Sequence, residues 1–99
     1  METARDGSRQ LRVHLHIRGR VQGVGFRAGA QAEAERLGVT GWVRNVEDGS
    51  VELEAQADPE TLERFLRWCQ RGPAGARVDA VDTSSRPPVG GEAGFAIRF

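Results

Sequence analysis

The residues of this chain that could do chemistry are concentrated in one glycine-rich stretch, GRVQGVGFRAG, at residues 19–29. The stretch contains no proline, so each of its residues can offer a backbone N–H to a ligand. Gly23 and Gly25 can adopt positive φ, which lets successive N–H groups converge as a nest. A helix that begins near Phe26 would add its unpaired N–H groups, and Arg27 would add a charge and a planar fork of donors. The stretch therefore predicts a phosphate-type anion site, with a plain glycine-rich connection as the alternative.

Two familiar phosphate-binding motifs do not fit this loop. The Walker pattern requires a lysine, and this chain has none. Gly23, Gly25 and Ala28 do match a dinucleotide fingerprint, with Glu47 and Asp48 about 20 residues further on. A doubly wound fold, however, needs more strands than 99 residues supply. Its second strand should also lead into a helix, whereas an Asp-Gly hairpin signal follows here.

The hydrophobic periodicity places this loop within an ordered series of elements. A period of two or a short apolar run predicts strands at 11–18, 39–46, 50–56, 76–83 and 94–99. A helical period predicts one helix from about Phe26 to a C-cap at Gly38, and a second from an N-cap at Asp58 to Gly72. We expect residues 1–10 to be a disordered tail, residues 11–99 to form one domain, and residues 84–94 to be a loop without a fixed conformation.

The order of these elements predicts the fold class. Strand, helix, strand, strand, helix, strand and a short closing strand form two split βαβ units. The expected architecture is an α+β, ferredoxin-like sandwich: a mixed, mainly antiparallel sheet with both helices on one face.

Three further side chains that could bind metal or react have simpler interpretations. His14 and His16 lie two residues apart on one strand face, but no third ligand is near in sequence and a metal site needs three or four. We interpret them as exposed strand histidines beside arginines. Cys69 falls on the apolar face of the second helix, which favours a buried structural thiol. No metal and no cofactor are expected.

Composition limits the classes of partner. Acidic and basic residues balance at 14 each, which argues against a nucleic-acid module. A ferredoxin-like RNA-binding module would stack bases on exposed aromatic residues of the sheet. Aromatic residues make up only 6% here, and the polar face of the first strand carries arginine and histidine. No apolar run approaches the roughly 18 residues of a membrane span, and no signal peptide is evident. We expect a cytoplasmic protein that acts as a monomer, without nucleic-acid or membrane partners.

Two linked motifs resemble the acylphosphatase family. The loop signature V-Q-G-V-x-F-R is complete at residues 21–27, and the signature G-W-V-x-N-x-x-D-G is complete at residues 41–49. The usual interval separates them, and the similarity extends over roughly residues 11–99. The fold of that family is ferredoxin-like, in agreement with the element order. Acylphosphatase-like domains also occur at the front of larger carbamoyl-handling proteins, which is the alternative to a free-standing enzyme.

The resemblance implies hydrolysis of acyl phosphates to carboxylate and inorganic phosphate without a metal. The family's phosphate-binding arginine corresponds to Arg27, and its water-positioning asparagine corresponds to Asn45. Inorganic phosphate and sulfate should compete with the substrate. The backbone N–H groups that cradle the phosphate correspond to Gln22, Gly23, Val24, Gly25 and Phe26.

The chain departs from the family pattern at two positions. A common threonine is replaced by Ala30, which removes a hydroxyl that could tie the loop to the helix, and a common glycine is replaced by Ala57. Neither change removes a group expected to touch the substrate. The first bears on the catalytic rate more than on the activity itself.

Overall fold

The computed structural model describes residues 9–99, so most of the expected N-terminal tail, residues 1–8, lies outside the described residues. The helices and strands follow the predicted order. They are β1 (Leu11–Arg20), α2 (Phe26–Leu37), β2 (Thr40–Asn45), β3 (Val51–Ala57), α3 (Pro59–Arg71), β4 (Arg77–Arg86) and β5 (Phe95–Arg98).

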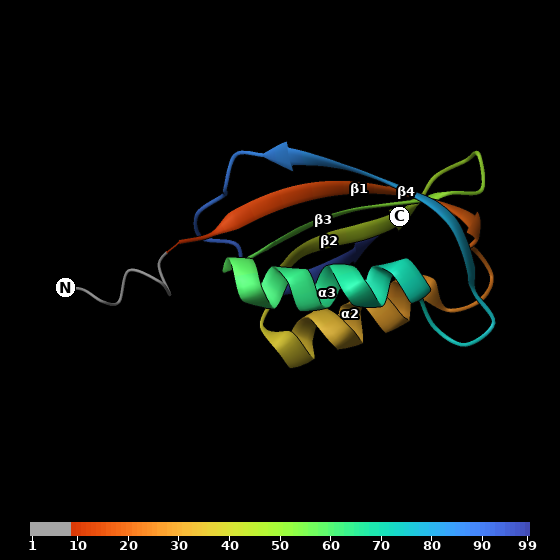
Figure 1. Cartoon of the computed structure of the whole chain (residues 1–99), viewed down its shortest axis with the longest axis horizontal. Coiled ribbons are helices and arrows are strands. Elements are labelled where there is room, and N and C mark those ends of the chain that lie inside the picture. Colours follow the sequence, from red (N-terminus) through yellow and green to blue (C-terminus); the bar gives the residue numbers. More distant parts are fainter. Residues whose placement is uncertain (1–8) are drawn as a thin grey trace.

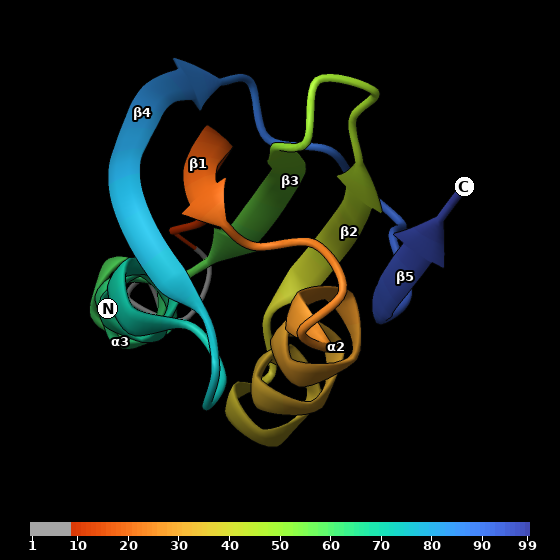
Figure 2. The same cartoon turned by 90° about the vertical axis from the view of Figure 1, so that its right-hand side faces the viewer.

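The five strands form one sheet in the order β4-β1-β3-β2-β5. All neighbouring pairs are antiparallel except β2 and β5, which run parallel. Both helices cover the same face of the sheet, with α3 beneath the β4 side and α2 beneath the β5 side (Figures 1 and 2). The predicted ferredoxin-like arrangement is confirmed. Within residues 9–99, neither helix has the length and the continuous apolar character needed to cross a membrane.

The core lies between the sheet and the two helices, where the sequence periodicity placed it. Burying one large apolar side chain contributes about 1.5–3 kcal/mol, so these periodic positions supply most of the driving force for folding. The predicted burial of Cys69 is confirmed, and burial raises the pKa of its thiol. The fully buried side chains from β1 and the two helices include Leu15, Ile17, Ala30, Ala34, Phe65 and Cys69.

The ends of the helices follow from local chemistry. The Asp58 carboxylate accepts a hydrogen bond from the Thr61 N–H at 3.2 Å, and Pro59 occupies the first turn of α3. Gly38 ends α2 in the left-handed region, at φ 83°. The N-cap of α2 is Gly25, also left-handed at φ 81°, and no side chain caps this helix start. The first turn of α2 therefore keeps its N–H groups available.

The segment after β4 is more ordered than the sequence predicted. Strand β4 continues to Arg86, and Gln56 exchanges two hydrogen bonds of 2.8 Å with the backbone of Val89. Arg12 is buried and binds Glu92 of this segment at 2.8 Å, which holds the pKa of the Glu92 carboxyl below its usual range. The prediction that this segment is a loop without a fixed conformation was wrong. The side chains that hold it, Gln56 and Arg12, are distant in sequence, so the local pattern does not reveal them.

The two histidines also differ from expectation, since both are half-buried. His14 lies 2.6 Å from the Glu52 carboxylate, and His16 lies 2.6 Å from the Ser50 hydroxyl. Trp42 on β2 also lies edge-on to His14, with the ring centres 6.5 Å apart. Both histidines therefore belong to the hydrogen-bond network of the open sheet face.

We expect Gly41→Ala to lower the stability of the folded protein more than any surface substitution would. Gly41 has φ 145°, and an added Cβ would lie 1.9 Å from the Glu54 carbonyl oxygen on β3. Strain and overlap together should lower the free energy of unfolding by about 3 kcal/mol or more. Denaturant unfolding measures this change.

Gly90→Ala is the matched control. It has no heavy atom within 4 Å of the added carbon and no left-handed φ. Its unfolding free energy should stay within about 0.5 kcal/mol of the parent. Equal stability of the two variants would contradict the close packing of β2 on β3.

Candidate active site

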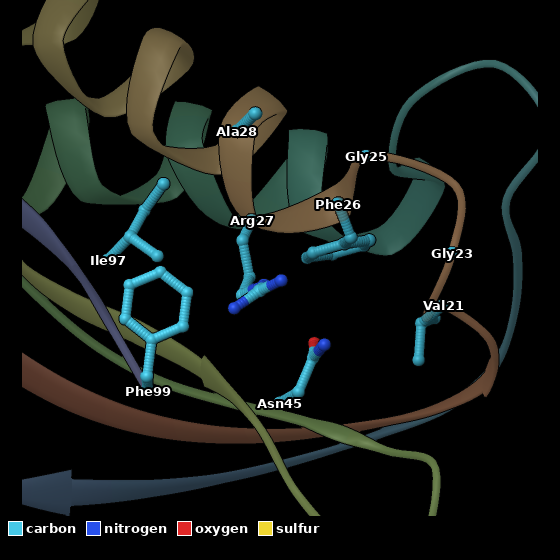
Figure 3. Close-up of a pocket in the computed structure, with 9 residues that line it drawn as sticks. All are labelled: Val21, Gly23, Gly25, Phe26, Arg27, Ala28, Asn45, Ile97 and Phe99. Atoms are coloured by element: carbon cyan, nitrogen blue, oxygen red, sulfur yellow. The ribbon is translucent and has the colours of Figure 1, made fainter.

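A pocket of about 230 Å³ opens where the loop after β1, the start of α2, the end of β2 and the C-terminal segment meet (Figure 3). Its lining is mainly apolar, with two polar side chains facing one another from α2 and β2. The lining residues are Val21, Gly23, Gly25, Phe26, Arg27, Ala28, Asn45, Ile97 and Phe99.

The loop has the backbone geometry of a nest. Gly23 and Gly25 are left-handed, at φ 77° and 81°, and Val24 between them is not. Among the hydrogen bonds found outside helices and strands in residues 9–99, none uses a backbone N–H of residues 22 to 26 as donor. Polar backbone groups are rarely left without a partner, so these N–H groups are available to an anion or to water.

Arg27 concentrates positive charge at the start of α2. It lies in the first helical turn, which contains no acidic residue. A cation at this end is opposed by the helix dipole, and an anion is favoured there. Within residues 9–99, Arg27 pairs with no carboxylate, whereas most arginines of the folded chain do. This half-buried guanidinium is therefore free to bind an anion in the pocket.

The C-terminal residues form a wall that sequence reasoning missed. The Arg27 guanidinium carbon lies 5.1 Å from the centre of the Phe99 ring, within the range of a cation–π contact. Ile97 on β5 lines the same side of the pocket. The alternation of Phe95, Ile97 and Phe99 was visible in the sequence. Only the parallel pairing of β5 with β2 brings it against α2.

Asn45 enters the pocket from the other side. It is the last residue of β2 and pairs with Val51 at the end of the β2–β3 ladder. Its half-buried side chain points toward Arg27 (Figure 3). Asp48 lies in the following turn, where its carboxylate accepts the Ser50 N–H at 2.9 Å. Asp48 is therefore a turn residue, as the Asp-Gly hairpin signal indicated. Arg27 and Asn45, which are 18 positions apart in sequence, both line the pocket.

The remaining predicted residues divide into two groups. Gly23, Gly25 and Phe26 line the pocket. Val24 instead packs its side chain against the hydrophobic core, and Gln22 directs its side-chain amide to the β2–β3 turn. For these two residues only the backbone N–H is a candidate contact with an anion.

Among residues 9–99, no carboxylate, histidine or cysteine side chain lines the pocket. Buried Cys69 is not among the lining residues, and its raised pKa keeps the thiol protonated. The chemistry available at the pocket is therefore electrostatic: N–H donors, one guanidinium and one amide.

Comparison with known proteins gives a consistent result. Residues 13–97 match the family model described as acylphosphatase. An acylphosphatase from Synechococcus sp. (strain JA-2-3B'a(2-13)) is 53% identical over 83 residues, which covers 84% of this chain and 88% of that protein. The structure of an acylphosphatase from Coxiella burnetii has a TM-score of 0.86 at 31% identity and covers 97% of this chain and 100% of that one. An acylphosphatase from Bacillus subtilis gives 0.85 at 32% identity, covering 90% and 99%.

Proposed function

Because the chain belongs to the acylphosphatase family and hydrolyses acyl phosphates, we propose that Arg27, Asn45 and the backbone N–H groups of residues 22 to 26 carry out this reaction without a metal. The observation that carries the proposal is the shared pocket. A guanidinium that pairs with no carboxylate of residues 9–99, a left-handed glycine nest and an asparagine amide converge there from separate segments.

The nest and Arg27 bind the phosphoryl group. Their donors suit a tetrahedral dianion, and the guanidinium adds a bidentate, charge-assisted contact. Phosphoryl transfer has a loose transition state with charge spread over the phosphoryl oxygens. Donors that are already oriented toward those oxygens stabilise the developing charge without reorganising during the reaction.

The leaving group explains why the pocket has no acid. A carboxylic acid has a pKa of about 4, so the carboxylate departs at neutral pH without being protonated. The part of the chain that the structure describes places no carboxylate or histidine side chain in the pocket lining, which is compatible with this substrate class. An alkyl phosphate would release a far more basic alkoxide and would need a general acid.

Asn45 positions the attacking water. Its amide oxygen accepts a hydrogen bond from the water, and its NH₂ donates to a phosphoryl oxygen. The water oxygen forms the new P–O bond while the bond from phosphorus to the acyl oxygen breaks. In this scheme a phosphoryl oxygen takes the water's proton, so R–CO–O–PO₃²⁻ and H₂O give R–COO⁻ and H₂PO₄⁻.

The same geometry supports two finer proposals on binding and assembly. Inorganic phosphate and sulfate should compete with substrate, because the nest and Arg27 recognise a tetrahedral anion and not the acyl group. We also propose that the protein acts as a monomer, because the fold of a single chain already brings Arg27, Asn45 and the nest to one pocket.

We expect the purified protein to release phosphate from an aromatic acyl phosphate at full rate in excess chelator. No step of the proposed reaction uses a metal, because Arg27 and the N–H groups neutralise the phosphoryl charge. Phosphate release with and without a chelator such as EDTA measures this. The matched control substrate is an alkyl phosphate monoester, which should be hydrolysed at least about 1,000-fold more slowly, since it needs an acid that the pocket lacks.

Loss of activity in chelator, with recovery on adding a divalent cation, would rule out the metal-free mechanism. Comparable kcat/KM for the acyl and alkyl substrates would instead reveal a general acid outside the proposed set.

A further inference from the structure

The site has two halves: the glycine-rich loop with Arg27, and Asn45 at the start of the β2–β3 turn. Within residues 9–99, no pair of strands joins the loop to the turn. β1 leaves β3 after the pair Ile17 and Val51, and β2 leaves β3 after the pair Asn45 and Val51. Beyond these pairs the glycine-rich loop and the β2–β3 turn have no ladder in common. Any contact that joins the loop to the turn must therefore lie outside the sheet.

The side chain of Gln22 makes that contact. Its Nε2 donates to the Val46 carbonyl oxygen at 2.7 Å and to the Ser50 carbonyl oxygen at 2.8 Å. An amide NH₂ has two hydrogens, so this half-buried group uses both donors on one turn. Val46 directly follows Asn45, and the contact therefore lies one residue from the catalytic amide.

The two acceptors are the oxygens that close the turn. The Val46 N–H donates to the Ser50 oxygen at 2.9 Å, and the Gly49 N–H donates to the Val46 oxygen at 3.0 Å. A carbonyl oxygen has two lone pairs, so each can accept from Gln22 as well. Gln22 thus binds two carbonyl oxygens that the hydrogen bonds of the turn already hold in place.

Residue Ser50, at the end of the same turn, also contacts β1. Ser50 is buried, and both its N–H and its hydroxyl donate to the Asp48 carboxylate, which lowers the pKa of Asp48. The Nε2 of His16 on β1 lies 2.6 Å from the hydroxyl oxygen of Ser50. A turn held on both sides has little freedom to move, so its contact with Gln22 fixes the distance between loop and turn.

We propose that the Gln22 side chain is a positioning residue that locks the loop to the β2–β3 turn and thereby aims Asn45 at the bound phosphoryl group. This role is separate from the backbone N–H of Gln22 and rests on the role proposed above for Asn45. The loop and helix start carry the nest and Arg27 themselves. Loss of the lock should therefore impair water attack more than phosphate binding.

The test begins with Gln22→Met, which keeps the shape of the side chain and removes both donors. A small misplacement of a reacting group can cost about a hundredfold in rate, so we expect kcat to fall about 10- to 100-fold. The inhibition constant of inorganic phosphate should stay within about threefold, because ground-state binding does not depend on Asn45.

Gln31→Met is the matched control. Gln31 donates one side-chain hydrogen bond to the Phe95 carbonyl oxygen at 3.0 Å, between α2 and β5. Gln31→Met also loses a hydrogen bond from a side-chain amide to a backbone carbonyl, but one that does not involve the β2–β3 turn. Its kcat should therefore stay within about twofold of the parent. Thermal melting of both variants separates a loss of folded protein from a loss of rate.

The double variant Gln22→Met/Asn45→Ala distinguishes positioning from general weakening. If Gln22 acts through Asn45, the double variant should have the kcat of Asn45→Ala alone. A further fall as large as that of Gln22→Met would overturn the inference, as would a normal kcat in Gln22→Met while Asn45→Ala is impaired. A normal kcat in Asn45→Ala would instead remove the proposed role of Asn45.

Gln22→Glu provides a second variant if Gln22→Met does not fold. Its ionised carboxylate would face two carbonyl oxygens and separate the loop from the turn, so kcat should fall at least as far. Normal kcat with a normal melting temperature would overturn the inference.

Discussion

Arg27→Ala should nearly abolish turnover, with a fall in kcat on the order of 10³- to 10⁵-fold, comparable to removal of an arginine that stabilises a phosphoryl-transfer transition state. Arg27 is the one charged side chain among the pocket-lining residues, and within residues 9–99 it pairs with no carboxylate. Its contact with phosphate exists in the ground state and in the transition state. The inhibition constant of inorganic phosphate should therefore rise as kcat falls, and steady-state kinetics with phosphate as inhibitor measures both.

Arg36→Ala is the matched control for Arg27→Ala. Arg36 lies on the same helix and carries the same charge, but it is exposed and pairs with Glu33 at 2.6 Å. Its kinetics should match the parent. Arg27→Ala also loses the contact with Phe99, worth about 0.5–1 kcal/mol at an exposed site, so its melting temperature should change little. Unchanged phosphate inhibition in a folded Arg27→Ala variant would contradict the binding role.

Asn45→Ala should lower kcat about a hundredfold, the loss expected when one oriented transition-state contact of about 3 kcal/mol is removed. Phosphate inhibition should hardly change, because the nest and Arg27 remain and the main contact of the amide is with the attacking water. Comparing kcat with the phosphate inhibition constant in one set of assays separates these two effects.

Glu47→Ala, in the exposed turn two residues later, is the control for Asn45→Ala. It alters the same hairpin without reaching the pocket and should keep the parent kcat. If Asn45→Ala weakens phosphate inhibition but converts bound substrate at the normal rate, Asn45 is a binding residue and the water-positioning role is wrong.

Most of the fold could be read from the sequence because it rests on short-range patterns. Alternating residues in β1, the capping carboxylate of Asp58 and the left-handed glycine at Gly38 act within a few positions of one another. The strand and helix order then admits few compact topologies. Candidate residues Arg27 and Asn45 were reached in the same way, from two local motifs and the family resemblance that they carry.

Only the tertiary structure decided which distant groups meet. Gln22 was chosen for its backbone N–H, yet its side-chain amide reaches across 24 and 28 residues to the turn beside Asn45. Phe99 stacks on Arg27, and Arg12 holds Glu92 across 80 residues. Periodicity records which side of an element faces the core, because that depends on immediate neighbours. A hydrogen bond between segments depends on how the elements pack against one another, which no local pattern contains.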